Sequence, residues 1–282
     1  MNAPTLRDTL HQAQQHGLDR LDAQMLLLHA LDRSPHDRAW LLTHDSNALP
    51  DAAAARWHTL LQRRQAGEPV AYLLGEKDFF GLNLAVDARV LVPRPDTETL
   101  VEWALEAMPA VGGPMPPRVL DLGTGSGAIA LALAQQRPDA HITATDASAD
   151  ALAVAQANAQ RLGLAVQFAH GHWLSAVPGQ RFDVIASNPP YIAEGDPHLR
   201  ALTHEPISAL TSGADGLDDI RSIIRQAGDA LLPGGWMLLE HGHDQAAAAR
   251  ALLRCAGFVQ VSSRTDLAGI ERCSGGCWPQ QR

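Results

Sequence analysis

Cysteine is scarce in this sequence. The 282 residues include three cysteines, Cys255, Cys273 and Cys277, all near the carboxyl end. An odd number of cysteines, without a set of histidine ligands close by, favours neither a disulfide framework nor a zinc site. We therefore expect free thiols of the kind found in a reducing compartment, a cytoplasmic protein and no bound metal.

Long apolar runs are also missing. No stretch approaches the roughly 20 apolar residues that a helix needs to cross a bilayer. The first ten residues, Met1 to Leu10, contain Arg7 and Asp8 and lack the apolar core of a signal peptide. We expect no membrane partner.

Basic residues are fewer than acidic ones. The chain has 22 Lys and Arg against 31 Asp and Glu, for a formal net charge of −9. Binding to a phosphate backbone depends on clustered Lys and Arg, so this balance argues against direct nucleic-acid binding. The composition, 46% hydrophobic and 19% charged, is that of a globular protein. The length suits one large domain and one small one.

Residues 1–68 are expected to form a small helical domain. Leu21, Met25 and Leu28 recur at helical spacing, and Asp19 is suited to cap the helix that they form. The region has no clustered catalytic residues, so its apolar stripe is best explained as the core of a helical bundle. Any separate function of this domain is expected to be substrate recognition.

Residues 69–92 are predicted to form a β-hairpin that links the two domains. Apolar residues alternate around Gly81, which is a turn signal. The following segment, Pro93 to Glu98, leads into a helix for which Asp96 is suited as the N-cap. We expect either a plainly capped helix or a helix start that lines a ligand pocket.

Residues 93–282 alternate between predicted strands and helices. The predicted strands are seven apolar segments: Val119–Leu120, His141–Thr145, Val166–Ala169, Phe182–Ser187, Trp236–Leu239, Val259–Val261 and Arg272–Cys277. Helices are predicted between most of them. This alternation is typical of an α/β fold with a doubly wound, mostly parallel sheet.

A glycine-rich stretch follows the first of these strands: Asp121-Leu122-Gly123-Thr124-Gly125-Ser126-Gly127. It lies between strand and helix, where α/β sheets bind nucleotides, and its glycines allow the backbone to approach a ligand closely. Dinucleotide-binding enzymes use a similar turn. Here, however, the spacing is Gly-x-Gly-x-Gly rather than Gly-x-Gly-x-x-Gly, and an acidic residue precedes it.

Two acidic residues narrow the choice of ligand. Asp121 could face an ammonium group but would repel a pyrophosphate. Asp146 ends the second strand, roughly 20 residues past the loop, where an acidic side chain accepts hydrogen bonds from ribose hydroxyls. An ammonium group, a ribose and no phosphate describe S-adenosylmethionine.

The fourth strand runs into Asn188-Pro189-Pro190-Tyr191. The two prolines have no N–H donor and hold their backbone rigidly, so this segment can offer carbonyl acceptors in fixed positions. Asn188 adds a side-chain carbonyl and Tyr191 a flat ring. Such a site could grip a planar group that carries an NH2. The alternative is an ordinary turn, because Asn-Pro and Pro-Pro are common turn dipeptides.

Together, the glycine loop and the Asn-Pro-Pro-Tyr segment resemble class I S-adenosylmethionine-dependent methyltransferases that act on planar amino or amide nitrogens. Further motifs are similar to those of the protein-(glutamine-N5) methyltransferases of peptide chain release factors. These motifs are Gly67-Glu68-Pro69-Val70-Ala71-Tyr72, Pro93-Arg94-Pro95-Asp96-Thr97-Glu98, Asn188-Pro189-Pro190-Tyr191-Ile192, Glu205-Pro206 and Asp266-Leu267-Ala268-Gly269. The resemblance implies a seven-stranded methyltransferase sheet that is preceded in the sequence by a small N-terminal helical domain.

The resemblance also implies cofactor-binding residues. The loop from Gly123 to Gly127 would carry the methionine and ribose parts of S-adenosylmethionine, and Asp146 would bind the ribose hydroxyls. Asp121 and Asn188 are also expected to belong to the cofactor site. Trp173 would lie near the adenine, although a core aromatic residue is the alternative there. Ser126 stands where we would expect Thr, a harmless departure.

For the substrate, the resemblance implies the glutamine of the Gly-Gly-Gln motif in class 1 release factors. Asn188 and the Pro189 carbonyl would hold the glutamine amide, with Pro190 and Tyr191 packing around it. One departure is the ending Cys273-Ser-Gly-Gly-Cys277, which is less apolar than expected and leaves the placement of the last strand open.

Two other functions compete with this one. An adenine amino-group methyltransferase acting on DNA or RNA would face the same task of gripping an NH2 on a flat ring. The acidic balance and the lack of a long basic insertion argue against it. A non-catalytic cofactor-binding module is the other, and the presence of both motifs argues against it.

Overall fold

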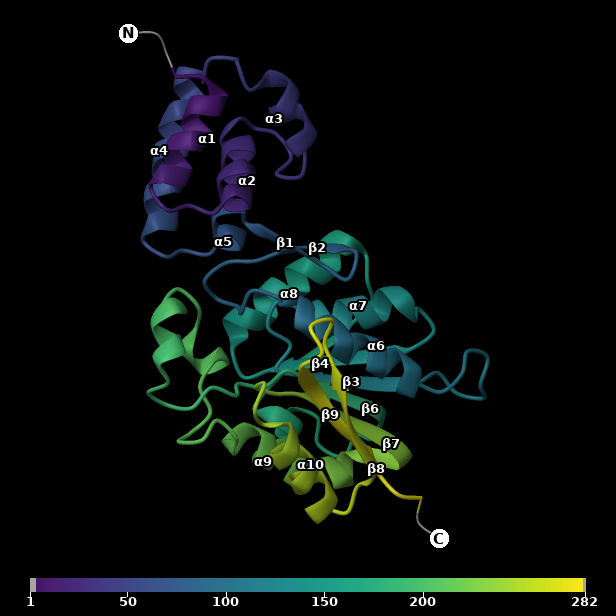
Figure 1. The fold of residues 1–282 in the computed structure, drawn as a ribbon. Helices are drawn as coiled ribbons and strands as arrows, with labels where there is room; N and C mark the ends of the chain where they lie inside the picture. The colour runs from purple at the N-terminus through teal and green to yellow at the C-terminus, as the bar shows by residue number, and fades with distance from the viewer. Residues whose placement is uncertain (1–3, 281–282) are drawn as a thin grey trace. The chain divides into compact units, whose positions relative to one another are not determined.

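The structure is a computed structural model that describes residues 4–280. The chain divides into two units, and the division falls between Glu76 and Lys77. Figure 1 shows the helices of the first unit in purple and blue and the sheet of the second in colours from teal to yellow. No helix within the described residues has the length and apolar character needed to cross a membrane.

The first unit is helical, as predicted. Asp19 accepts a hydrogen bond from the Leu21 N–H at 2.7 Å and so caps the second helix. The core of this unit includes Leu26, Leu27 and Leu28, which are fully buried. Burying a side chain of this size contributes roughly 1.5–3 kcal/mol. The helices are α1 (Leu6–Gln15), α2 (Arg20–Ala30), α3 (Arg38–His44), α4 (Asp51–Gln65) and α5 (Val70–Leu74).

The hairpin predicted over residues 69–92 is shorter than expected: it consists of β1 (Glu76–Phe79) and β2 (Leu82–Ala85), and residues Val70–Leu74 form α5 instead. Its two turn residues, Phe80 and Gly81, have φ values of 49° and 76°. Positive φ at both positions gives the type I′ turn that matches the twist of paired strands.

The second unit is built on a seven-stranded sheet with the order β5-β4-β3-β6-β7-β9-β8. All neighbouring strands are parallel except that β9 runs antiparallel to β7 and β8. The predicted doubly wound, mostly parallel α/β sheet is therefore confirmed. The strands are β3 (Arg118–Leu122), β4 (His141–Asp146), β5 (Gln167–His170), β6 (Phe182–Ser187), β7 (Leu231–Glu240), β8 (Val259–Thr265) and β9 (Glu271–Cys277).

Helices cover both faces of the sheet (Figure 1). Along each central strand the side chains alternate between two apolar cores, because successive residues of a strand point to opposite faces. In β6, for example, Val184 and Ala186 enter one core and Ile185 enters the other. The first core is shared with α6 (Glu98–Ala107), α7 (Ala128–Gln136) and α8 (Ala149–Leu162). The second core is shared with α9 (Asp218–Ala230) and α10 (Ala246–Cys255).

Four 3₁₀ helices complete the described elements: η1 (Pro95–Thr97), η2 (Trp173–Ala176), η3 (Pro197–Ala201) and η4 (Ile207–Ala209). The prediction that Asp96 caps the helix after Pro95 is wrong. Asp96 lies inside η1, α6 begins at Glu98, and the Asp96 carboxylate instead pairs with Arg272 at 3.3 Å.

The carboxyl ends of three adjacent strands meet at one edge of the sheet. Leu122 at the end of β3 is in register with Thr145 of β4 and with Ser187 of β6. The glycine loop follows β3, Asp146 is the last residue of β4, and Asn188 follows β6. Parallel strand order alone thus brings the three predicted motifs to one edge.

Candidate active site

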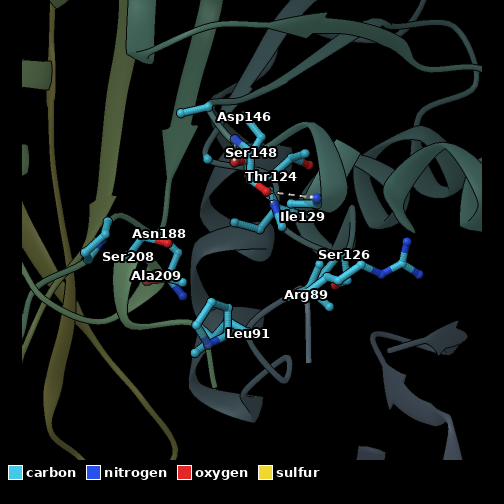
Figure 2. Close-up of a pocket in the computed structure, with 18 of the residues that line it drawn as sticks. Arg89, Leu91, Thr124, Ser126, Ile129, Asp146, Ser148, Asn188, Ser208 and Ala209 are labelled. Carbon is cyan, nitrogen blue, oxygen red and sulfur yellow. Dashed lines mark hydrogen bonds between the residues drawn. The ribbon is translucent and has the colours of Figure 1, made fainter. Parts of the chain in front are cut away.

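A cavity of about 410 Å³ opens at this edge of the sheet. Figure 2 shows part of its lining, with Thr124, Asp146 and Ser148 close together and Asn188, Ser208 and Ala209 on another side. Eight of the predicted site residues line this cavity: Gly123, Thr124, Gly125, Ser126, Asp146, Trp173, Asn188 and Pro190. Four others, Asp121, Gly127, Pro189 and Tyr191, are not part of its lining.

The glycine loop needs its glycines for their backbone conformation and for close packing. Gly123, Gly125 and Gly127 have φ values of 72°, 56° and 87°, in the left-handed region that favours glycine. A Cβ added at Gly127 would also lie 2.9 Å from Leu131 Cδ1. The loop is therefore tightly turned where α7 begins.

Asp146 joins the end of β4 to the glycine loop. Its Oδ2 accepts a hydrogen bond from the Gly125 N–H and its Oδ1 accepts one from the Ser148 N–H, both at 2.9 Å. These bonds fix the carboxylate at the cavity wall. Each carboxylate oxygen has a second lone-pair direction, so Asp146 can still accept hydrogen bonds from hydroxyl groups of a ligand.

Asp121 is fully buried behind the loop. Its Oδ2 accepts hydrogen bonds from the Thr124 hydroxyl at 2.6 Å and from the Ala130 N–H at 3.2 Å. Its Oδ1 has no partner among residues 4–280. Burial raises the pKa of this carboxyl to about 7, although both hydrogen bonds favour the ionised form. The contacts that Asp121 makes hold the loop and the start of α7 together.

Trp173 follows β5 and has a backbone φ of 48°, which is rare for a bulky residue. Two contacts hold it there. Its indole N–H donates to Asp219 Oδ1 at 3.2 Å, and its ring packs so closely on the loop that a Cβ added at Gly123 would lie 3.1 Å from Trp173 Cζ3. Strained conformations of this kind persist where the surroundings fix them and are common at binding sites.

Asn188 stands where two cavities adjoin. A second, smaller cavity of about 70 Å³ shares Leu91, Arg94, Asn188 and Ala209 with the larger one. The Asn188 Nδ2 donates to the Thr97 hydroxyl at 3.3 Å. Its Oδ1 is buried and has no hydrogen-bond partner within residues 4–280. A buried carbonyl oxygen without a donor is costly, and a ligand N–H would satisfy it.

The rest of the Asn-Pro-Pro-Tyr segment surrounds Asn188. Pro189 is buried, Pro190 lines the larger cavity, and Tyr191 lines the smaller one. The Tyr191 backbone is anchored on both sides. Its N–H donates to the Leu210 carbonyl at 3.2 Å, and its own carbonyl accepts from the Gln245 side chain at 2.9 Å.

One further polar group near the site, Glu240, was not among the predicted site residues. The Tyr191 hydroxyl donates to Glu240 Oε1 at 3.4 Å, whereas Glu240 Oε2 is buried and has no hydrogen-bond partner among residues 4–280. Glu240 is the last residue of an apolar strand, as Asp146 is. An acidic residue at a strand's carboxyl end could therefore have pointed to it. Thr97, Pro93 and Arg94 line the larger cavity, so the start of α6 does face the ligand pocket.

Comparisons with known proteins identify relatives of this chain. Residues 104–213 match the family described as methyltransferase small domain, and residues 5–75 match the PrmC N-terminal domain. A Bordetella pertussis protein named release factor glutamine methyltransferase is 56% identical over 92% of this chain and 95% of its own length. A Burkholderia pseudomallei protein of the same name is 51% identical over 93% of each chain. The crystal structure of a methyltransferase from Pyrococcus furiosus shares the fold, with a TM-score of 0.54 and 21% identity over 79% of this chain and 98% of that one.

Proposed function

The chain belongs to the release factor glutamine methyltransferase family, and we propose that it methylates the side-chain amide nitrogen of a protein glutamine. The methyl donor is S-adenosylmethionine, and the target is the glutamine of the Gly-Gly-Gln motif in class 1 release factors. The observation that carries this proposal is the Asn188 side chain. Its buried, unpartnered Oδ1 lies where the two cavities adjoin and can accept one N–H of a carboxamide.

The larger cavity fits S-adenosylmethionine. The cofactor supplies, when bound, an electrophilic methyl group on a positively charged sulfur. The loop from Gly123 to Gly127 would hold its methionine and ribose parts, Asp146 would accept hydrogen bonds from the ribose hydroxyls, and Trp173 would lie by the adenine. Asp121 would act through Thr124, whose hydroxyl it holds.

The smaller cavity would receive the glutamine side chain. The lone pair of an amide nitrogen is delocalised into its carbonyl, which makes it a poor nucleophile. Asn188 Oδ1 and the Pro189 carbonyl would each accept one N–H and turn the nitrogen toward the methyl group, while Pro190 and Tyr191 pack around the amide. Catalysis is then mainly orientation, and the nitrogen releases a proton to solvent as it gains the methyl group.

The alternative of an adenine amino-group methyltransferase is not favoured. The relatives found over more than 90% of this chain are named for release factor glutamine. The net charge of −9 also gives little attraction for nucleic acid. We place the reaction in the cytoplasm, in keeping with the sparse use of cysteine.

The decisive experiment incubates the protein with methyl-labelled S-adenosylmethionine and a purified class 1 release factor. A release factor whose Gly-Gly-Gln glutamine is changed to alanine serves as the matched control. We expect label on the wild-type release factor alone. Equal labelling of both release factors would overturn the proposed target, and labelling of an adenine-containing oligonucleotide would support the alternative. Asn188→Ala is expected to abolish most of the transfer while it leaves the affinity for S-adenosylmethionine within a factor of about two.

A further inference from the structure

We propose that Asp219 is a positioning residue for S-adenosylmethionine, because it holds the Trp173 indole in place as part of the wall of the larger cavity. This inference rests on the proposed function, since it concerns the cavity that would bind the cofactor. Asp219 and Trp173 both line this cavity. They come from different elements, Asp219 from α9 and Trp173 from η2.

Trp173 has a conformation that must be held. Its φ of 48° lies in the left-handed region, which a bulky side chain rarely adopts. Such a residue keeps its conformation only where its surroundings fix it, and otherwise it relaxes to a more populated region. The indole would move with the backbone. A ligand that packs on this ring therefore depends on the contacts that fix Trp173.

One of these contacts is steric and the other is polar. The ring packs on the glycine loop, where a Cβ added at Gly123 would lie 3.1 Å from Trp173 Cζ3. The indole N–H, which can only donate, donates to Asp219 Oδ1 at 3.2 Å. Packing of a flat ring tolerates rotation and sliding, whereas a hydrogen bond requires a direction. Asp219 is thus the contact that fixes how the indole is turned.

Asp219 is itself anchored through its backbone. It is the second residue of α9, and its N–H donates to the Ser212 hydroxyl at 2.8 Å. Ser212 is buried, and its own N–H donates to the Ile192 carbonyl at 3.0 Å. Ile192 directly follows the Asn-Pro-Pro-Tyr segment and lines the smaller cavity. A continuous set of hydrogen bonds therefore leads from the substrate segment to the indole.

The position of Trp173 predicts an effect on cofactor binding rather than on methyl transfer. Trp173 would lie by the adenine, and the ribose separates the adenine of S-adenosylmethionine from the reacting methyl group. A displaced indole would remove packing from the bound cofactor and from the transition state alike. Such a loss raises the KM for the cofactor and leaves kcat unchanged.

The first test compares two substitutions of Asp219 by calorimetry with S-adenosylmethionine. Asp219→Ala removes the acceptor, and we expect its Kd to rise about tenfold, as for the loss of one hydrogen bond. Asp219→Asn keeps an oxygen for the indole N–H and should stay within about threefold of the wild type. The kcat at saturating cofactor should stay within about twofold in both variants. Equal losses of affinity in Ala and Asn, or a lower kcat with an unchanged Kd, would overturn the inference.

Asp218→Ala is the matched control. Asp218 is the neighbouring residue at the start of α9, and it pairs with Arg221 at 2.9 Å instead of lining the cavity. The control removes the same charge from the same turn of helix. We expect its Kd to stay within about twofold of the wild type. A tenfold rise in Asp218→Ala would mean that charge at the start of α9, and not the contact with Trp173, governs cofactor binding.

The second test is a double-mutant cycle between Asp219 and Trp173. Trp173→Phe keeps an aromatic ring beside the glycine loop and removes the N–H. If Asp219 acts through the indole, Asp219→Ala should raise Kd about tenfold in the wild type and less than twofold in Trp173→Phe. Equal effects in the two backgrounds would show that Asp219 acts without Trp173.

The third test needs no cofactor. The chain has six tryptophans, and the indole N–H signal that disappears in Trp173→Phe identifies Trp173 in the NMR spectrum. This signal should shift in Asp219→Ala and stay in place in Asp218→Ala. A signal that does not move in Asp219→Ala would overturn the inference. If the wild type does not bind S-adenosylmethionine, the proposed function fails. If the wild type binds it and methylates the release factor, while Asp219→Ala has the same Kd as the wild type, only the present inference fails.

Discussion

Arg94 and Glu205 form an ion pair although 111 positions separate them in the sequence. Arg94 precedes η1, and Glu205 lies in the long segment between Tyr191 and α9. Glu205 also accepts a hydrogen bond from the Val92 N–H at 3.0 Å. The side chain of Glu205 is 2% exposed and that of Arg94 is 37% exposed. The carboxylate of Glu205 is therefore the buried partner of the pair, and the guanidinium of Arg94 keeps contact with water. The pair ties together two segments that line both cavities.

The Glu205→Ala variant tests this connection. It removes the partner of Arg94 and leaves the Val92 N–H without its acceptor, so we expect the free energy of unfolding to fall by about 1–3 kcal/mol. Because Arg94 keeps access to water, the cost stays below that of an ion pair buried on both sides. Chemical denaturation measures the change. Glu194→Ala, at an exposed position of the same segment, should change stability by less than about 0.5 kcal/mol. Equal effects of the two variants would show that the Arg94 contact contributes nothing specific.

Replacement of Asp146 should weaken the binding of S-adenosylmethionine specifically. Asp146→Asn places an NH2 where the carboxylate accepts from the Gly125 or Ser148 N–H, and it removes the charge that ribose hydroxyls would meet. We expect the Kd for S-adenosylmethionine, measured by calorimetry, to rise by about 10- to 100-fold. Asp150→Asn is the matched control, because Asp150 is exposed nearby in α8. An unchanged Kd in Asp146→Asn would exclude the ribose role.

The sequence allowed the sheet and the three motifs at its edge to be predicted because each depends on a short stretch of chain. Apolar runs of strand length mark the central strands. The glycine loop, Asp146 and Asn188 each directly follow such a run, and parallel strands bring their carboxyl ends to one edge. No information about distant residues was needed for these predictions.

The arrangement behind Asn188 could not be predicted in the same way. Thr97, Tyr191 and Glu240 come from three distant parts of the chain, and α6, which begins directly after Thr97, packs against β7, the strand that ends at Glu240. Asp96 shows the consequence. Local sequence preference favoured an N-cap, but its long-range contact with Arg272 places it inside η1 instead.

The last strand lies where it was predicted, and its small residues have a steric reason. β9 lies between β7 and β8, and its glycines pack against side chains on both faces of the sheet. A Cβ added at Gly275 would lie 2.5 Å from Leu238 Cδ2 and 3.1 Å from the Trp103 ring, and one at Gly276 would lie 2.9 Å from Phe258 Cβ. Small residues are therefore required in this segment, where the family resemblance led us to expect a more apolar ending.

Gly275→Ala should consequently be costly. The added methyl group would also meet the Met237 carbonyl oxygen at 2.9 Å, and this backbone atom cannot rotate away. We expect a loss of about 1–3 kcal/mol in the free energy of unfolding, in the range found for overpacked cores. Gly113→Ala, in an exposed loop where the nearest atom to the added Cβ is 3.4 Å away, should be close to neutral. A stable Gly275→Ala protein would mean that β9 can shift between its neighbours.

The buried carboxyl of Asp121 predicts how stability depends on pH. Burial raises its pKa from 3.8 to about 7. The unfolded chain therefore loses this proton near pH 4, whereas the folded chain keeps it up to about pH 7. Between these values the folded state binds more protons, so this carboxyl makes the free energy of unfolding fall as the pH rises, by on the order of 3 kcal/mol from pH 5 to 8.

The comparison of wild type with Asp121→Asn isolates this effect from the other titrating groups. Asparagine keeps an oxygen that can accept from the Thr124 hydroxyl and the Ala130 N–H, and it has no charge to bury. Urea denaturation at pH 5, 6, 7 and 8 should therefore show a steeper decline in stability for the wild type than for the variant, whatever their difference at pH 5. Parallel curves for the two proteins would mean that the Asp121 carboxyl ionises at its ordinary pH in the folded chain. The desolvation of this carboxyl behind the glycine loop would then not oppose its charge.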